Sequence, residues 1–240
     1  MPDKQNIDAA PRFLFSYLLG ADGRGTAVDA EAVDRWTPQD GNLWLHFDIA
    51  SQGARQWLEQ DSGLPARVID VLLAEETRPR SLTMDSGLLI VLRGVNTNPG
   101  ADLEDMVSVR VWVEPHRVIS TRRRRLLSVV DIAKCLDDGN GPGSPSALLA
   151  MLVDRLAERI GDFVDSIESH LDAIEDEIGT ANPGSIRLKL SPLRRQMAAV
   201  RRFLAPQRDA LDRLYRQPVD YIEEADANNM REQSDRITRY

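Results

Sequence analysis

The sequence predicts an α+β fold, in which a mixed β-sheet flanked by helices is followed by a long antiparallel helical hairpin and a further helix. In residues 1–140, which hold all four tryptophans and most glycines, short apolar runs alternate with turn signals. Residues 144–216 contain two glycine-poor segments whose apolar side chains recur every three or four positions. We therefore expect an α/β sheet domain over 1–140, a helix pair over 144–216 and the start of a third helix over 217–240.

Six segments of the first part have the composition and alternation of β-strands. They are Arg12–Leu19, Asn42–Ile49, Ser81–Met84, Gly87–Val95, Val107–Glu114 and Arg117–Ser120. In the second of these, the even-numbered residues Trp44, His46 and Asp48 fall on one face and the odd-numbered apolar residues on the other. Gly20–Gly25 is expected to be a turn.

Two short helices are expected between the second and third strands. Ser51 is a suitable N-cap for the first, which carries Trp57 and Leu58. Pro65–Glu76 has its apolar residues at helical spacing and forms the second. With the strands, they suggest a mixed sheet with helices on it.

The helical half has two apolar stripes at helical spacing. The first helix is predicted over Ser144–Gly179 and is ended by Asn182-Pro183-Gly184. The second stripe runs over 186–214 and contains two prolines. Pro192 could mark the true helix start, and Pro206 predicts a kink unless a neighbour satisfies the freed carbonyl.

The charges of the two helices are segregated. Residues 158–177 carry eight acidic residues and one arginine, whereas residues 187–216 carry nine basic residues and two aspartates. The simpler interpretation is an electrostatic zipper between antiparallel helices, with each exposed contact contributing a few tenths of a kcal/mol.

The alternative interpretation of the acidic helix is cation binding. Asp165, Glu168 and Asp172 share one face, and such an oxygen-only stripe suits hydrated Mg²⁺ better than Zn²⁺. His170 is the best single metal-ligand candidate among the histidines, but no carboxylate lies three or four positions from it. A regulatory Mg²⁺ or Zn²⁺ site in this region remains a hypothesis.

The third helix has few apolar residues, with Asp226 and Gln233 at positions where apolar residues would be needed. A helix of this kind is not expected to bury a face within one chain, so it should face solvent, line a polar channel or pair with copies of itself. The helical pattern continues to Tyr240, which suggests that the natural chain continues further.

Arg122, Arg123, Arg124 and Arg125 form the densest basic run. It is interpreted as a solvated strand end facing the acidic helices, with contact to an anion or to anionic lipid headgroups as the alternative.

The composition excludes several classes of protein and site. The 240 residues include one cysteine, Cys135, which rules out an internal disulfide framework and a zinc site built from CxxC motifs. The net charge of −8 argues against nucleic acid as a partner. No GxSxG, P-loop or HExxH motif is present, so we do not expect an enzyme. His46 is interpreted as structural and His116 as a surface residue of a turn.

Five segments, taken in order, resemble the cytoplasmic region of ZntB-type zinc transporters, which belong to the CorA superfamily. They are WLHFD (Trp44–Asp48), LLAEETRPR (Leu72–Arg80), LRGVN (Leu92–Asn96), EDMVSVRVW (Glu104–Trp112) and RRFLAPQRDAL (Arg201–Leu211). The resemblance implies an α/β domain, two antiparallel helices and a stalk helix that leads into the membrane.

The resemblance also implies a homopentamer in the plasma (inner) membrane, with this segment in the cytoplasm and Zn²⁺ as the transported ion, and no required cofactor. Asp226, Asn229 and Gln233 would then line a wet funnel between the copies. The family's pore tripeptide is absent from this sequence, so no selectivity residue can be assigned. The alternatives are a CorA-type Mg²⁺ or Co²⁺ transporter, which EETRPR and LAPQRDAL make less favoured, and a free-standing helical interaction module.

Overall fold

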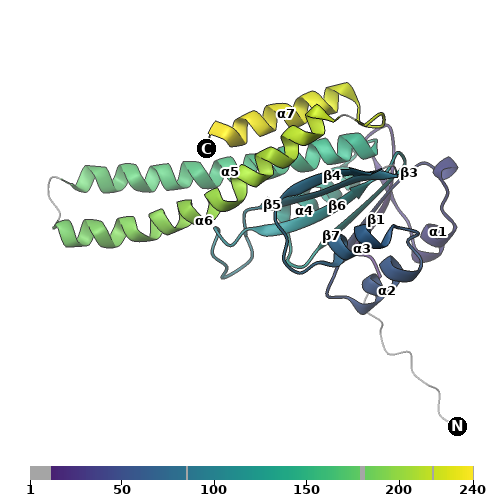
Figure 1. Ribbon diagram of the computed structural model, residues 1–240, viewed down its shortest axis with the longest axis horizontal. Helices are drawn as coiled ribbons and strands as arrows, with labels where there is room; N and C mark the ends of the chain where they lie inside the picture. Colours follow the sequence, from purple (N-terminus) through teal and green to yellow (C-terminus); the bar gives the residue numbers. More distant parts are fainter. Residues whose placement is uncertain (1–11, 85, 179–181, 218, 240) are drawn as a thin grey trace, which may run out of the picture.

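The computed structural model describes residues 12–84, 86–178, 182–217 and 219–239. Gly179 and Tyr240, at the ends of two predicted helices, lie outside these residues. A twisted sheet is packed between helices, and two long helices project well beyond it (Figure 1). This is the predicted α+β arrangement.

The sheet has seven strands in the order β2-β1-β3-β7-β6-β5-β4. Their bounds are β1 Phe15–Leu19, β2 Gly25–Ala27, β3 Asn42–Asp48, β4 Arg80–Met84, β5 Gly87–Gly94, β6 Val107–Val113 and β7 Arg117–Arg122. The sheet is mixed, because β3 and β7 are parallel, with Leu43 opposite Arg117, while the other neighbouring pairs are antiparallel. All six predicted strands are confirmed, with small shifts at their ends.

The helices are α1 Ala30–Arg35, the 3₁₀ turn η1 Pro38–Asp40, α2 Gln52–Gln60, α3 Ala66–Leu73, α4 Leu127–Asp138, α5 Pro145–Glu177, α6 Pro183–Arg216 and α7 Glu224–Arg239. Side-chain hydrogen bonds cap the N-termini of several of these helices. The hydroxyl of Ser51 accepts from Ala54 N–H, that of Ser144 accepts from Ala147 N–H, and the side-chain oxygen of Asn182 accepts from Gly184 N–H. Two of these helices also have proline in the first turn, where no hydrogen-bond donor is needed.

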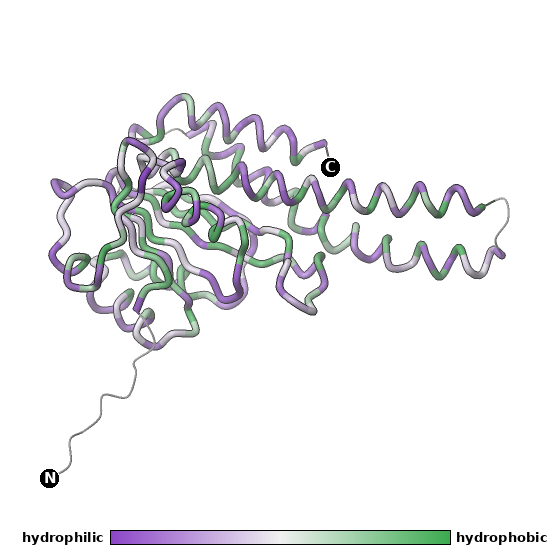
Figure 2. Tube along the Cα trace, turned by 180° about the vertical axis from the view of Figure 1, so that it is seen from behind, coloured by the Kyte–Doolittle hydropathy of each residue, from purple (hydrophilic) through white to green (hydrophobic). Residues whose placement is uncertain are grey.

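The two faces of the sheet have separate cores. On one face, Trp44 and residues of α4, α5 and α6 form a single cluster that extends to Ile237 of α7. On the other, Leu45 and Phe47 pack with residues of α2 and α3, such as Trp57. The predicted alternation along β3 is therefore confirmed. Figure 2 shows hydrophobic residues gathered in the strands, whereas α7 is mostly hydrophilic.

The second long helix differs from its prediction at the prolines. It begins at Pro183 and continues through both Pro192 and Pro206, so Pro192 is not its start. The two prolines lack the N–H that would bond to the carbonyls of Leu188 and Arg202, and both of these residues are exposed.

The third helix also differs from its prediction, because α7 has a packing face within one chain. Met230, Gln233, Ser234 and Ile237 are buried where α7 lies on α5 and α6. These residues recur at three and four positions, so a stripe that includes two polar residues is enough to dock this helix.

Candidate functional site

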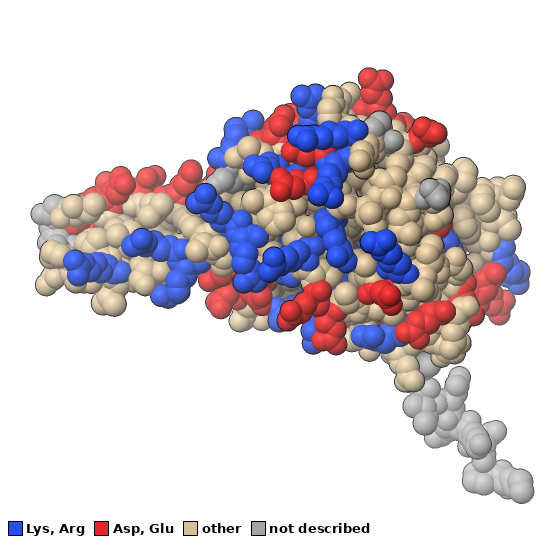
Figure 3. All heavy atoms as spheres, viewed as in Figure 1, with Lys and Arg blue, Asp and Glu red and all other residues tan. Residues whose placement is uncertain are grey.

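The acidic face of α5 consists of exposed carboxylates. Asp165, Glu168 and Asp172 are exposed, whereas Ile167 and Ile174 of the same helix are buried. Acidic side chains line one edge of the projecting helices and basic side chains line the other (Figure 3). The charge segregation predicted from the sequence is therefore present on the surface.

The exposed His170 lies on this outer part of α5. Its Nδ1–H donates to the carbonyl of Ser166, one turn earlier. Within the described ranges, no three His, Cys, Asp or Glu side chains come together as ligands for a metal ion. One chain alone therefore offers separate carboxylates along a helix and not a closed metal cage.

The basic face of α6 is joined to α5 near the outer end of the pair. Lys189 Nζ lies 2.6 and 2.5 Å from the two carboxylate oxygens of Glu177. Arg187, Arg194 and Arg201 are exposed along the same helix. Exposed pairs contribute little, so the buried apolar seam between the helices is the main source of their stability.

The three residues expected to line a funnel lie in three different environments on α7. Asn229 is exposed, Asp226 is half-buried, and Gln233 is buried against the neighbouring helices. Polar contacts also hold α7 on α6: Ser234 Oγ donates to Asp212 at 2.9 Å, and Arg231 donates to Tyr215 at 3.0 Å.

The arginine run at the end of β7 is expected from the sequence to face the acidic helices. In the structure, two of its arginines instead make ion pairs with loop residues. Arg123 pairs with Glu75 at 3.0 Å, and Arg124 pairs with Asp105. Arg122 is half-buried, and its burial lowers its pKa. Arg125 is exposed.

Arg123 and Arg124 form one wall of a polar cavity of about 740 Å³, here called the Arg93 cavity. It lies between the segment after α3, the β5–β6 loop, the end of β7 and α6, and Figure 3 shows basic side chains gathered over the region where α6 crosses the sheet. Its other lining residues include Thr77, Arg93, Glu104, Arg202 and Phe203.

These residues come from four distant segments, so no spacing in the sequence groups them. A signal was nevertheless present: Thr77, Arg93, Glu104 and Arg202 each belong to a different one of the five segments that carry the family resemblance.

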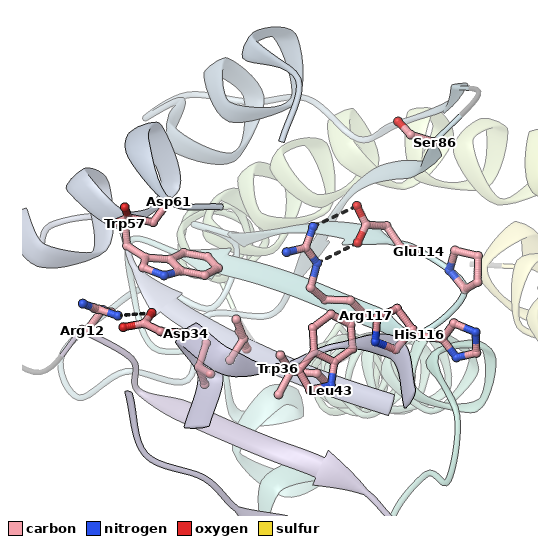
Figure 4. Close-up of a pocket in the computed structure, with 14 residues that line it drawn as sticks. Arg12, Asp34, Trp36, Leu43, Trp57, Asp61, Ser86, Glu114, His116 and Arg117 are labelled. Atoms are coloured by element: carbon pink, nitrogen blue, oxygen red, sulfur yellow. Dashed lines mark hydrogen bonds and ion pairs between the residues drawn. The ribbon is translucent and has the colours of Figure 1, made fainter. Parts of the chain in front are cut away.

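A second cavity, of about 790 Å³, opens between α1, α2 and the sheet (Figure 4). Its walls combine Trp36 and Trp57 with two ion pairs. Arg117 Nε lies 2.7 Å from Glu114 Oε2, and Arg12 Nη1 lies 2.7 Å from Asp34 Oδ1. These ion pairs satisfy four of the charged groups, and Asp61, Ser86 and His116 are further polar residues of the lining.

His46 is structural, as predicted. It is completely buried, and its Nδ1 lies 2.8 Å from Ser120 Oγ. Burial, followed by the nearby charge of Arg122, lowers its pKa from 6.5 to about 3. The imidazole is therefore neutral at physiological pH. His116 is exposed in its turn, as expected.

Comparison with known proteins places this geometry in a family. The model of the family described as "CorA-like Mg2+ transporter protein" matches residues 39–240, which include the sheet from β3 onward and all the long helices. The chain belongs to this CorA-like family. In the described part of this CorA-like chain, no helix combines the length and the apolar character needed to cross a membrane.

Curated relatives of this CorA-like chain are transporters. It is 39% identical over 232 residues to the divalent cation transporter CmaX of Pseudomonas aeruginosa, with 94% of this chain and 69% of the relative covered. It is 30% identical over 226 residues to the zinc transport protein ZntB of Yersinia enterocolitica, with 94% and 68% covered.

Solved structures show the same CorA-like architecture. Full-length CmaX superposes with a TM-score of 0.88 at 36% identity, covering 97% of this chain and 72% of that one. The cytoplasmic domain of ZntB from Vibrio parahaemolyticus superposes at 0.81 with 26% identity, covering 95% and 88%. The soluble domain of CorA from Methanocaldococcus jannaschii shares the fold, with a TM-score of 0.75 at 13% identity and coverage of 95% and 90%.

Proposed function

We propose that this chain is the cytoplasmic domain of a divalent-cation transporter of the ZntB and CmaX type. The observation that carries the proposal is the shared architecture: 97% of the chain superposes on full-length CmaX, including the sheet, the projecting helix pair and α7. The ZntB cytoplasmic domain supports the same assignment. Zinc is the ion we favour, with Mg²⁺ or Co²⁺ as the alternative.

The test is a chimera in which residues 12–239 replace the matching region of CmaX. The purified chimera is reconstituted in liposomes, and the entry of Zn²⁺, Mg²⁺ and Co²⁺ is followed with ion-sensitive dyes. CmaX and CmaX without its matching region are the controls. We expect metal entry well above that of the shortened control. A chimera that inserts and is stable, yet transports no better than empty liposomes, would contradict the proposal and favour a free-standing interaction module.

We further propose that the transporter is a homopentamer in the inner membrane, with this domain on the cytoplasmic side. Copies of α7 would then surround a wet axis, and the exposed Asn229 and half-buried Asp226 are the polar residues best placed to face it. Native mass spectrometry of the chimera in detergent gives the number of copies, and a species other than a pentamer would contradict this.

The acidic face of α5 is proposed as an open contact for a hydrated cation. Its support is the exposed row of Asp165, Glu168 and Asp172; the exposed His170 lies on a different face of the same helix. Titration calorimetry with Mg²⁺ and with Zn²⁺ compares the chain with a variant that has alanine at the three acidic positions. We expect weak binding that this variant loses, and no loss when His170→Ala is tested with Mg²⁺. Equal binding by the triple variant would reject this contact.

A further inference from the structure

The Arg93 cavity contains several buried polar atoms without a protein partner. Thr77 Oγ1, Arg93 Nε and Glu104 Oε2 are buried, line the cavity and make no hydrogen bond with the described residues. Thr77 is only 8% exposed. Buried polar groups in proteins are nearly always hydrogen-bonded, so three in one cavity indicate a missing partner.

Arg110 adds positive charge directly behind the cavity wall. It is completely buried, and its Nη2 donates to the carbonyls of Ala74 and Glu75, the second of which lines the cavity. Its Nε and Nη1 atoms make no hydrogen bond with the described residues. Burial, together with the charges of Arg93 and Arg123, lowers the pKa of Arg110 to about 10, so it is still charged at neutral pH.

The ring of Phe203 makes cation–π contacts with two guanidinium groups of the cavity. Its ring centre lies 4.1 Å from Arg93 Cζ and 4.8 Å from Arg202 Cζ. Arg93 also donates to the carbonyls of Met106 and Thr77, both at 2.6 Å. Two like charges are thus held at fixed positions, as in sites that bind anions.

The lining carries five acidic residues and five arginines, so its formal charges balance, and the additional positive charge comes from Arg110 behind the wall. Glu75 and Asp105 are already paired with Arg123 and Arg124. Glu76, Asp102 and Glu104 line the cavity together with Arg78, Arg93 and Arg202, and Arg110 lies behind the wall. The cavity therefore combines a charge-balanced lining, one buried arginine behind it and one buried carboxylate oxygen that needs a hydrogen-bond donor.

We propose that the Arg93 cavity binds a phosphate group, either as inorganic phosphate or on a small phosphorylated metabolite. Arg93 Nε–H, the Arg202 guanidinium and Thr77 Oγ–H donate to the phosphate oxygens. Glu104 Oε2 accepts from the P–OH of inorganic phosphate or from a hydroxyl of the metabolite. The volume of about 740 Å³ lies in the range of small-molecule sites and leaves room for more than phosphate alone.

Titration calorimetry of the 240-residue chain at pH 7 and constant ionic strength tests the proposal, with inorganic phosphate, AMP and sulfate as probes. We expect saturable binding of phosphate or AMP, and sulfate at least about tenfold weaker, because sulfate has no hydroxyl for Glu104. Tighter binding of AMP than of phosphate would identify a metabolite site, and the reverse a free-phosphate site. No saturable binding of either, or equal binding of sulfate and phosphate, would overturn the proposal.

Variants distinguish a defined phosphate site from non-specific electrostatic attraction of anions. Arg202→Gln should weaken phosphate binding about tenfold, whereas Arg201→Gln, an exposed neighbour outside the cavity lining, should change it less than about twofold. Glu104→Gln should bring sulfate and phosphate affinities closer together, since an amide can donate to sulfate. Equal losses in the two arginine variants, or an unchanged preference in Glu104→Gln, would count against the site. These measurements use no metal and no membrane, so they are independent of the proposed transport function.

Discussion

The backbone N–H of Arg93 donates a hydrogen bond of 2.6 Å to Oε1 of Gln207. On this side of β5, β4 pairs only as far as Val91, so Arg93 lies beyond the reach of the neighbouring strand. Gln207, 1% exposed on α6, supplies the acceptor instead. A second bond, from Ser81 Oγ to the carbonyl of Ala210 at 2.8 Å, ties the same helix to β4. The root of α6 is therefore attached to the sheet by hydrogen bonds as well as by apolar packing.

Replacing Gln207 by leucine should lower the free energy of unfolding by about 1–3 kcal/mol, because the N–H of Arg93 would be buried without an acceptor. Urea unfolding followed by circular dichroism measures the change. Gln196→Leu, at a half-buried position of the same helix, is the control and should stay within about 0.5 kcal/mol of the wild type. A Gln207 variant as stable as this control would mean that the bond contributes little.

Truncating apolar side chains between α5 and α6 should lower the free energy of unfolding, and the loss should be larger for a more deeply buried side chain. Ile167 is 2% exposed, so Ile167→Ala should cost about 2–4 kcal/mol. Leu171, one turn further along, is only half-buried, so Leu171→Ala should cost less, about 1 kcal/mol. Thermal or urea unfolding of both variants checks the order, and equal losses would contradict the observed difference in burial.

The buried His46 should make stability fall on mild acidification. Its pKa is about 3 in the folded chain against 6.5 for a free histidine, so between these values the unfolded chain binds a proton that the folded chain does not. The contribution of His46 to the free energy of unfolding is fully present above about pH 6.5. It is lost as the pH falls, with a slope approaching about 1.4 kcal/mol per pH unit.

This slope is measured by urea unfolding between about pH 6.5 and pH 5, above the range in which ordinary carboxylates titrate. His46→Gln removes the titrating group and should flatten the dependence. His116→Gln, at an exposed histidine, should retain the wild-type slope. If His46→Gln kept that slope as well, another group would have to be responsible.

Docking of α7 should depend on its narrow buried stripe. Met230→Asp places a charge at a residue that is 3% exposed, so α7 should separate from α5 and α6 while the sheet stays folded. Amide hydrogen exchange should then increase about tenfold or more in residues 224–239 and remain unchanged in the strands. Asn229→Asp adds the same charge at the adjacent exposed position and should not alter the exchange.

Most of the strands and both long helices could be predicted because each carries a local pattern. The α5 stripe places Ile160, Ile167 and Ile174 on one face, and all three are buried. The prediction missed α4 (Leu127–Asp138), although its buried Val129, Ile132, Ala133 and Leu136 recur at helical spacing. It also missed α1, which has only six residues, too few to show a period, and β2, which consists of the three residues Gly25–Ala27.

The polar stripe of α7 and the Arg93 cavity could not be predicted for a different reason. Gln233 is a poor core residue by composition, and only the position of α5 and α6 makes its face buried. Likewise Thr77 and Arg202 are 125 positions apart in the sequence (202 minus 77), and the crossing of α6 over the sheet brings them to one cavity. A site formed by distant segments has no characteristic spacing of residues along the sequence by which it could be predicted.

The projecting helix pair has a mechanical consequence. With 33 residues, α5 is about 50 Å long, and its inner half is anchored in the core while its outer half extends past the sheet (Figure 1). The pair is thus a lever whose short arm lies beside Arg93, Gln207 and the cavity. Over the outer half, about 25 Å long, a tilt of about 5° displaces the far tip by about 2 Å, so a small change of angle near the sheet is carried to a distant part of the molecule.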